Sequence, residues 1–194
     1  MKYVLRDYQA RASDAGVAYL QNPRLKRRHG VIVQPTGSGK SLVIASIASR
    51  LDGPCVVFQP SREILDQNAA KLAAYGYRPA LFSASKNRRE IGDITLATIG
   101  SVMHYIEHFR QIPYIIVDEC HLVSADGGMY QEFLSSLPSA RVLGLTATPY
   151  RLASNSFGSQ LRFITRSGPK IFRDVVYYTQ GGGLLKQGDL FPLQ

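Results

Sequence analysis

The chain alternates short runs of consecutive apolar residues with longer, more mixed segments. The runs Val31–Val33 and Tyr114–Val117 are typical of strands buried on both faces of a parallel sheet. We predict strands near 30–34, 55–59, 80–83, 94–97, 114–118 and 142–146, and helices near 6–21, 39–51, 62–75, 99–109 and 129–136. Because strands and helices alternate, the pattern predicts an α/β fold, a doubly wound and mainly parallel sheet with helices on both faces.

The alternation weakens after Pro149. The following residues include Gly181–Gly183, Gly188 and Pro192, which favour turns and irregular chain. We therefore expect one folded domain over residues 1–150 and an irregular extension over 151–194. A chain of 194 residues with 45% hydrophobic content can bury one substantial core.

The segment Gln34–Ser41 lies between a predicted strand and a predicted helix, the order that a phosphate-binding P-loop requires. Gly37 and Gly39 let the backbone amides face inward toward phosphates. Lys40 can reach the β- and γ-phosphates, and the Ser41 hydroxyl can ligate Mg²⁺. The strict pattern has glycine at position 34, where this chain has glutamine, and a glycine-rich hairpin is the alternative. The flanking strand and helix favour a nucleotide-binding loop.

A second candidate segment, Asp118–His121, follows the apolar run that ends at Val117. A carboxylate at the carboxyl end of a central strand lies beside the P-loop in an open α/β sheet. Asp118 would hold Mg²⁺, and Glu119 would orient or deprotonate the water that attacks the γ-phosphate. A solvated strand end is the alternative. A zinc site is disfavoured because no second pair of ligands accompanies Cys120 and His121.

These segments resemble, in order, the motifs of the first RecA-like domain of superfamily 2 DEAD/DEAH-box helicases. The motifs are Leu5–Gln9 (Q motif), Pro35–Ser41 (motif I), Gln59–Glu63 (motif Ia), Thr98–Ser101 (a later strand-binding motif), Asp118–His121 (motif II, with cysteine in place of alanine) and Thr146–Pro149 (motif III). The residues of segments 144–151 and 172–174 resemble those of RadD-type bacterial DNA-repair helicases and of the helicase subunits of restriction enzymes. Six motifs in one order are far more specific than any single motif.

The resemblance implies ATP and Mg²⁺ as cofactors and assigns a role to each matching residue. The nucleotide-binding residues are Arg6, Gln9, Pro35, Thr36, Gly37, Ser38, Gly39, Lys40 and Ser41; the metal ligands are Ser41 and Asp118; and the catalytic residues are Lys40, Asp118 and Glu119. The residues expected to contact nucleic acid are Ser61, Arg62, Thr98 and Ser101, which would bind the phosphate backbone independently of base sequence. Thr146 and Thr148 would link the nucleotide state to the second domain.

The resemblance also implies a second RecA-like domain that carries an arginine finger, and we expect that domain to be absent from this chain. The net charge of +9 suits a polyanionic partner, and we expect DNA, as a single strand or a duplex junction. No apolar run reaches the length of a membrane span and the amino terminus lacks a signal-peptide pattern, so we expect no membrane partner. Reduced thiols at Cys55 and Cys120 favour the cytoplasm.

The sequence therefore predicts the ATP-binding amino-terminal motor domain of a DNA helicase or translocase that acts in DNA repair. Little ATP hydrolysis is expected from this chain alone, because the resemblance places the arginine finger elsewhere. Two alternatives remain open. One is the motor subunit of a restriction enzyme, and the other is a nucleotide-binding switch module without turnover.

Overall fold

The computed structural model describes residues 4–25, 28–84, 87–124, 127–155, 158–166 and 170–179. The strands are β1 (His29–Val33), β2 (Cys55–Phe58), β3 (Ala80–Ser83), β4 (Arg88–Arg89), β5 (Ile94–Ala97), β6 (Tyr114–Asp118), β7 (Arg141–Thr146), β8 (Tyr150–Asn155), β9 (Gly158–Phe163) and β10 (Phe172–Tyr178). The α-helices are α1 (Asp7–Gln21), α2 (Lys40–Ala48), α3 (Arg62–Ala74), α4 (Ile99–Val102) and α5 (Met129–Ser136). Short 3-10 helices are η1 (Pro23–Leu25), η3 (Met103–Phe109) and η4 (Cys120–Leu122).

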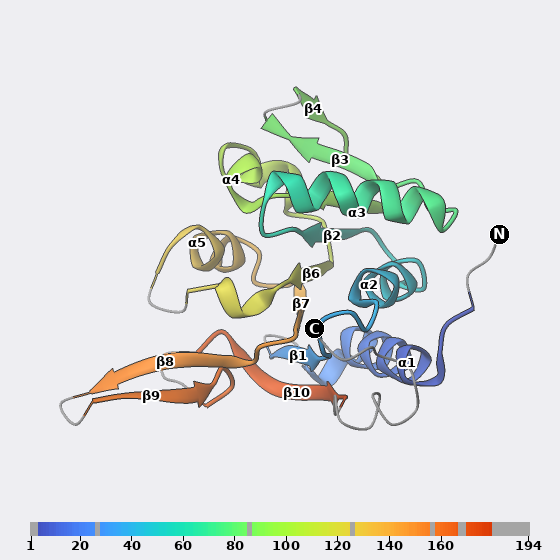
Figure 1. Ribbon diagram of the computed structural model, residues 1–194. Coiled ribbons are helices and arrows are strands. Elements are labelled where there is room, and N and C mark those ends of the chain that lie inside the picture. Colours follow the sequence, from blue (N-terminus) through green and yellow to red (C-terminus); the bar gives the residue numbers. More distant parts are fainter. Residues whose placement is uncertain are drawn as a thin grey trace.

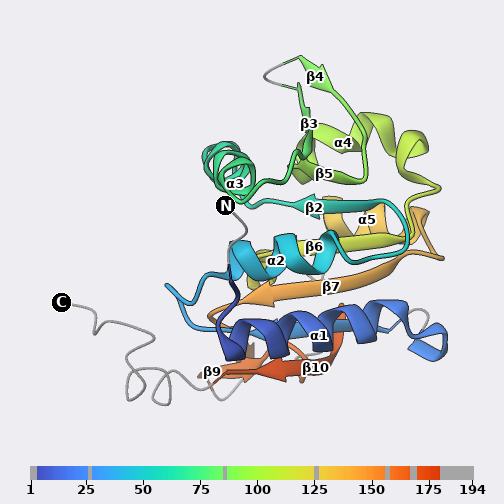
Figure 2. The same cartoon turned by 90° about the vertical axis from the view of Figure 1, so that its right-hand side faces the viewer.

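Eight strands form one sheet in the order β10-β1-β7-β6-β2-β5-β3-β4. Every neighbouring pair in it is parallel except β3 and β4, so the carboxyl ends of the central strands meet at one edge. Helices α1, α2 and α3 cover one face, and α4, η3 and α5 cover the other (Figures 1 and 2). The predicted doubly wound α/β fold is confirmed.

Two apolar clusters fill the space between the sheet and its two helical layers. Alternation along β1 separates them: Ile32 points to the layer of α1–α3, whereas Val31 and Val33 point to the other layer. Phe133 of α5 packs edge-to-face on Phe58 of β2, with ring centroids 5.1 Å apart. Because both faces of the central strands are covered, those strands consist almost wholly of apolar residues.

The region after Pro149 differs from the sequence prediction. β8 and β9 form an antiparallel hairpin, and β10 pairs in parallel with β1 at the edge of the main sheet (Figure 1). Phe172 of β10 is 1% exposed, and the amide of Thr179 donates a 2.9 Å hydrogen bond to the Val33 carbonyl. The expectation of an irregular extension over 151–194 is therefore wrong for the described residues, and the folded domain does not stop at residue 150. The glycines and proline of 181–192 lie outside the described residues.

The edge strand β10 is not predicted from the sequence because polar residues interrupt its apolar pattern. Asp174 lies in the middle of this strand. Its carboxylate pairs with the Arg28 guanidinium and accepts a 2.7 Å hydrogen bond from the Tyr19 hydroxyl of α1. The Arg28 hydrogen bond is the main cause that holds the pKa of Asp174 below its ordinary value. Partners far away in the sequence thus make a charged residue acceptable in the strand.

The expected helix over 99–109 is also modified. The chain forms one turn of α-helix in α4 and continues as the 3-10 helix η3, with a break at Tyr105, where φ is −134°.

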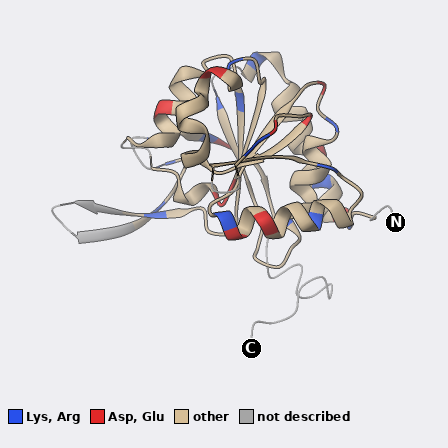
Figure 3. Ribbon diagram, turned by 90° about the horizontal axis from the view of Figure 1, so that it is seen from above, with Lys and Arg blue, Asp and Glu red and all other residues tan. Residues whose placement is uncertain are grey.

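Basic and acidic residues are interspersed over the domain (Figure 3). Among the described helices, none combines the length and the apolar character needed to cross a membrane.

Candidate functional site

The P-loop connects β1 to α2 at the carboxyl edge of the sheet. Gly37 and Gly39 adopt φ values of 78° and 80°, a region that residues with a β-carbon rarely occupy. Gly39 precedes the first residue of α2, Lys40, so the free amides of the helix start face the loop. The amide of Gln34 bonds to the Thr146 carbonyl at 3.0 Å, which ties the loop to the end of β7. This geometry creates a backbone cradle for an anion.

The amino-terminal helix α1 holds the P-loop from the side. The Tyr8 hydroxyl and Gln9 Nε2 both donate to the Ser38 carbonyl, at 3.0 and 2.8 Å. Gln9 Oε1 accepts from the Arg6 amide at 3.0 Å. A β-carbon on Gly39 would approach Gln9 Nε2 to 2.5 Å. The Gln9 side chain, one of the nucleotide-binding residues that the resemblance implies, therefore lies against the phosphate loop itself.

Lys40 forms an ion pair with Glu119, the predicted catalytic carboxylate. Lys40 Nζ lies 3.3 Å from Glu119 Oε1, and His121 Nδ1 lies 3.3 Å from Glu119 Oε2. His121 Nδ1 is also 2.8 Å from the hydroxyl of Thr146 at the end of β7. Glu119 has φ 47°, a left-handed conformation uncommon for a residue with a side chain. The backbone turn at Glu119 directs its carboxylate to the P-loop lysine.

A buried amide joins the two predicted metal ligands. Asn68 of α3 is 4% exposed, and its Oδ1 accepts a 2.9 Å hydrogen bond from the Ser41 hydroxyl. Asn68 Nδ2 donates to Gln59 Oε1 at 2.7 Å and to Asp118 Oδ2 at 3.4 Å. The other oxygen of Asp118 accepts from the Glu119 amide at 3.0 Å. Ser41 and Asp118 thus lie on either side of one side chain.

The Asp118 carboxyl is costly to ionise where it lies. It is 6% exposed. Burial, assisted by the neighbouring charge of Glu119, raises its pKa from the ordinary 3.8 to about 6. Lys40 and the hydrogen bonds from the Glu119 amide and Asn68 act in the opposite direction. A cation bound beside Asp118 would remove this penalty.

The donor set fits a magnesium nucleotide. The Ser41 hydroxyl and the Asp118 carboxylate are hard oxygen ligands, which Mg²⁺ prefers, and Mg²⁺ takes its other ligands from phosphate and water. Ser38 is 1% exposed and its hydroxyl has no hydrogen-bond partner within the described chain, so the loop contains a polar atom ready for a ligand. The described residues contain no group of three or more His, Cys, Asp or Glu side chains that could hold a metal ion. Cys120 is fully buried under Gly144 of β7.

The four predicted nucleic-acid residues follow two adjacent strands, β2 and β5. Ser61 caps α3 by accepting from the Ile64 amide at 3.3 Å, and Arg62, the first residue of α3, is exposed. Thr98 and Ser101 share a 2.9 Å hydrogen bond at the start of α4. Because β2 and β5 pair in parallel, both groups lie at the same carboxyl edge as the P-loop. The structure therefore brings these residues to one edge of the sheet.

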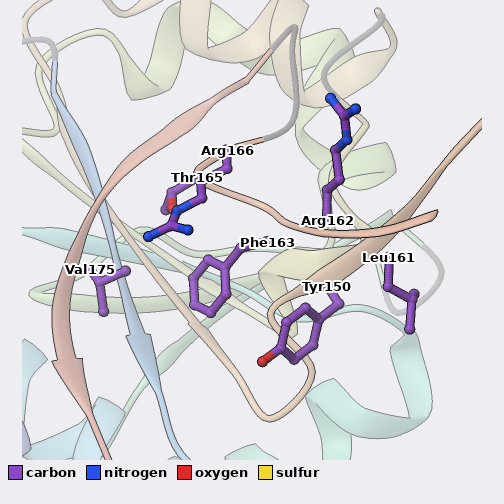
Figure 4. A pocket seen from close by; sticks show the side chains of 7 residues that line it. All are labelled: Tyr150, Leu161, Arg162, Phe163, Thr165, Arg166 and Val175. Carbon is purple, nitrogen blue, oxygen red and sulfur yellow. The ribbon is translucent and has the colours of Figure 1, made fainter.

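A separate pocket of about 680 Å³ lies where the β8–β9 hairpin meets β10 (Figure 4). It is lined by Tyr150, Leu161, Arg162, Phe163, Thr165, Arg166 and Val175. None of these residues belongs to the predicted nucleotide or nucleic-acid sites. The pocket therefore lies apart from the candidate chemistry.

The sequence matches the family described as "Type III restriction enzyme, res subunit" over residues 2–151, and the chain belongs to that family. Over 187 residues it is 29% identical to the DNA 3'-5' translocase XPB2 of Sulfurisphaera tokodaii, a match covering 95% of this chain and 39% of that protein. It is 28% identical over 165 residues to the general transcription and DNA repair factor IIH helicase/translocase subunit XPB1 of Arabidopsis thaliana, covering 76% of this chain and 21% of that protein. The predicted superfamily 2 resemblance is confirmed.

A solved structure of the Type ISP restriction-modification enzyme LlaGI, a nuclease-deletion mutant in complex with a DNA substrate mimic, shares the fold of this chain. The TM-score is 0.67 at 17% sequence identity, and the match covers 98% of this chain and 21% of that one. At this identity the likeness concerns the fold alone. The chain spans less than half the length of the two curated relatives described above.

Asn68 is the site residue that the sequence analysis misses. A signal for it exists: Leu65, Asn68 and Leu72 occupy the buried side of α3 at helical spacing. An amide between two buried leucines requires hydrogen-bond partners in the interior. Those partners lie in three other segments of the chain, so the sequence pattern alone does not identify them.

Proposed function

We propose that this chain is the ATP-binding motor domain of a DNA helicase or translocase. The observation that carries the proposal is the ion pair between Lys40 of the P-loop and Glu119 of motif II, with Nζ and Oε1 3.3 Å apart. In this ion pair, a mobile cation and a carboxylate lie beside the glycine-containing P-loop at the carboxyl edge of the sheet. Membership of the restriction-enzyme family and similarity to a DNA translocase support the same assignment.

Each residue of the site has a task in phosphoryl transfer. When bound, Mg-ATP supplies the γ-phosphoryl group and a metal ion that neutralises phosphate charge. Lys40 would exchange its partner Glu119 for phosphate oxygens, and Ser41 and Asp118 would hold the metal. The released Glu119 carboxylate would then orient the attacking water and accept its proton. His121, hydrogen-bonded to Thr146, lies beside Glu119 and can transmit this change to motif III.

Nucleotide contact extends to α1 in this proposal. Arg6, at the start of the helix, and the remaining N–H of Gln9 would contact the base. Gln9 also bonds to the Ser38 carbonyl, so a shift of the P-loop on nucleotide binding moves α1 as well. Pro35, Thr36 and Ser38 complete the loop around the phosphates.

The proposed partner is DNA, as a single strand or a duplex junction, held through its phosphates by Ser61, Arg62, Thr98 and Ser101. A second RecA-like domain of the parent protein would close over the nucleotide. The chain spans 39% of the length of the Sulfurisphaera tokodaii translocase, so such a domain fits within the length of that relative. The free, buried thiols of Cys55 and Cys120 favour a cytoplasmic location.

The biological process is proposed to be DNA repair, supported by the similarity to the Arabidopsis repair-factor subunit. The motor subunit of a restriction enzyme is the second candidate, and the family description favours it. A nucleotide-binding switch without turnover is a third, which the position of Glu119 beside Lys40 disfavours.

Calorimetric titration of Mg-ATP into wild type and the Lys40→Ala variant tests the proposal. We expect the variant to lose most of the affinity, because it lacks the mobile cation directed at the phosphates. Lys71→Ala, an exposed lysine in the last turn of α3, serves as the matched control and should bind like wild type. Equal binding by wild type and Lys40→Ala would rule out the P-loop as the nucleotide site.

A further inference from the structure

Asn68 occupies the interior of α3 at the point where three segments of the candidate site converge. Its carboxamide accepts one hydrogen bond and donates two, and the partners Ser41, Gln59 and Asp118 come from the start of α2 and the ends of β2 and β6. An amide offers an acceptor and two donors on one rigid group, and here all three functions are used. A side chain that merely filled the core would need no such set of partners.

The hydrogen bond from Ser41 fixes the direction of its hydroxyl proton. Because the proton points at Asn68 Oδ1, the lone pairs of Ser41 Oγ point elsewhere and are free to face a cation. The distance of 2.9 Å is normal for a hydrogen bond from a hydroxyl. Asn68 therefore prepares the hydroxyl for metal ligation before any ligand arrives.

The same amide orients the second predicted ligand. Asn68 Nδ2 lies 3.4 Å from Asp118 Oδ2, and the Glu119 amide lies 3.0 Å from Asp118 Oδ1. These two donors fix the plane of the Asp118 carboxylate from both sides. The shorter bond from Nδ2 to Gln59 Oε1, 2.7 Å, keeps the Asn68 amide from rotating. One side chain thus sets the relative orientation of both oxygen ligands.

We propose that Asn68 is a positioning residue for Mg²⁺, which holds Ser41 and Asp118 in a geometry that accepts the metal of the bound nucleotide. The inference rests on the proposed function, since it assumes that the P-loop binds a magnesium nucleotide. Groups that orient metal ligands through hydrogen bonds contribute about 10–100-fold to metal affinity. Asn68 does not contact the metal and takes no part in the chemistry.

The experiment compares nucleotide affinity with and without the metal, so that positioning is separated from folding. ADP is titrated calorimetrically into wild type, Asn68→Leu and Asn68→Ala, once in EDTA and once in excess Mg²⁺. Leucine has the same branched heavy-atom skeleton as asparagine, so this variant leaves no large cavity, and alanine adds no bulk. Gln67→Leu, which removes an exposed amide one residue earlier in α3, is the matched control.

We expect both Asn68 variants to bind ADP in EDTA within about twofold of wild type, whereas their Mg²⁺-dependent gain falls by about tenfold or more. Gln67→Leu should retain the full gain. Retained binding in EDTA also shows that a variant is folded. In a double-mutant cycle, the combined loss of Asn68→Ala and Ser41→Ala should be smaller than the sum of the two separate losses, because part of the Asn68 effect acts through Ser41.

An undiminished Mg²⁺-dependent gain in the Asn68 variants would overturn the inference. Equal losses in EDTA and in Mg²⁺ would also overturn it, because they indicate a purely structural role. Failure of the proposed function gives a different result: wild type itself would then not bind ADP, or would bind it equally well after Lys40→Ala.

Discussion

The buried Asp118 carboxylate should destabilise the metal-free chain at neutral pH, and Asp118→Asn should therefore stabilise it. The folded chain raises the pKa of Asp118 from 3.8 to about 6, mainly through burial. A difference of this size corresponds to about 3 kcal/mol of folding free energy. The cost is fully present above pH 6, where the carboxylate is charged, and disappears as the pH falls below the ordinary value of 3.8.

The substitution also disturbs one hydrogen bond, because the new amide offers only one acceptor to the donors of Glu119 and Asn68. That loss costs about 1 kcal/mol. We therefore expect Asp118→Asn to gain roughly 1–2 kcal/mol at pH 7. The gain should shrink by about 1 kcal/mol by pH 5, where wild-type Asp118 is mostly protonated in the folded state.

Urea unfolding in EDTA, followed at pH 7, 6 and 5, measures this difference for wild type and variant. Asp93→Asn, an exposed carboxylate outside the site, is the control and should behave like wild type throughout. A stability difference that does not change with pH, or that grows toward acid, would show that the charge of Asp118 does not destabilise the folded chain. The expected result would show that the site retains a destabilising charge, as expected where function requires a cation ligand.

Three further predictions concern nucleic acid, catalysis and the fold. Arg62→Ala should weaken binding of single-stranded oligonucleotides of all sequences alike, and should lower the slope of log binding constant against log salt concentration by about 0.7. Arg78→Ala, before β3 at the opposite edge, is the control and should change neither. Loss of binding for one sequence only would contradict backbone contact. Phosphate release should stay near background in the 194-residue chain, because the proposed second domain carries the arginine finger, which supplies about 10³–10⁵ in rate. In a protein that carries both domains, Glu119→Gln should abolish phosphate release and spare nucleotide binding; DNA-stimulated, Glu119-dependent hydrolysis by the chain alone would contradict this. Phe172→Ala should cost about 3–5 kcal/mol in urea unfolding, far more than Val175→Ala, which alters an exposed position of β10; a small loss would show that β10 is not part of the core.

Much of this fold and site could be predicted from the sequence, because the relevant signals are local. The β-branched run of β1 and the two glycines of the P-loop lie within a few residues of each other, and the neighbouring carboxylates Asp118 and Glu119 lie at the end of the apolar run of β6. The parallel topology then follows from the alternation of strands and helices. The predicted proximity of Lys40 and Glu119 depends only on the rule that parallel strands end at one edge.

The features that the sequence analysis misses depend on distant partners. Asp174 makes β10 look unlike a buried strand, yet its hydrogen-bond partner Tyr19 lies 155 residues earlier in the chain. Asn68 looks like an ordinary helical residue, although its hydrogen bonds reach Ser41, 27 residues before it, and Asp118, 50 residues after it. Polar groups inside a fold are explained only by the three-dimensional arrangement that satisfies them.

A crystal structure of the chain with Mg-ADP and a γ-phosphate mimic such as beryllium fluoride tests the proposed nucleotide site directly. We predict that the diphosphate lies on the amides of Gly37–Ser41, and that Lys40 Nζ has moved from Glu119 to the phosphate oxygens. We also expect Ser41 and Asp118 to face the metal ion. A nucleotide bound elsewhere, with the Lys40–Glu119 ion pair intact, would show that the P-loop is not the nucleotide site.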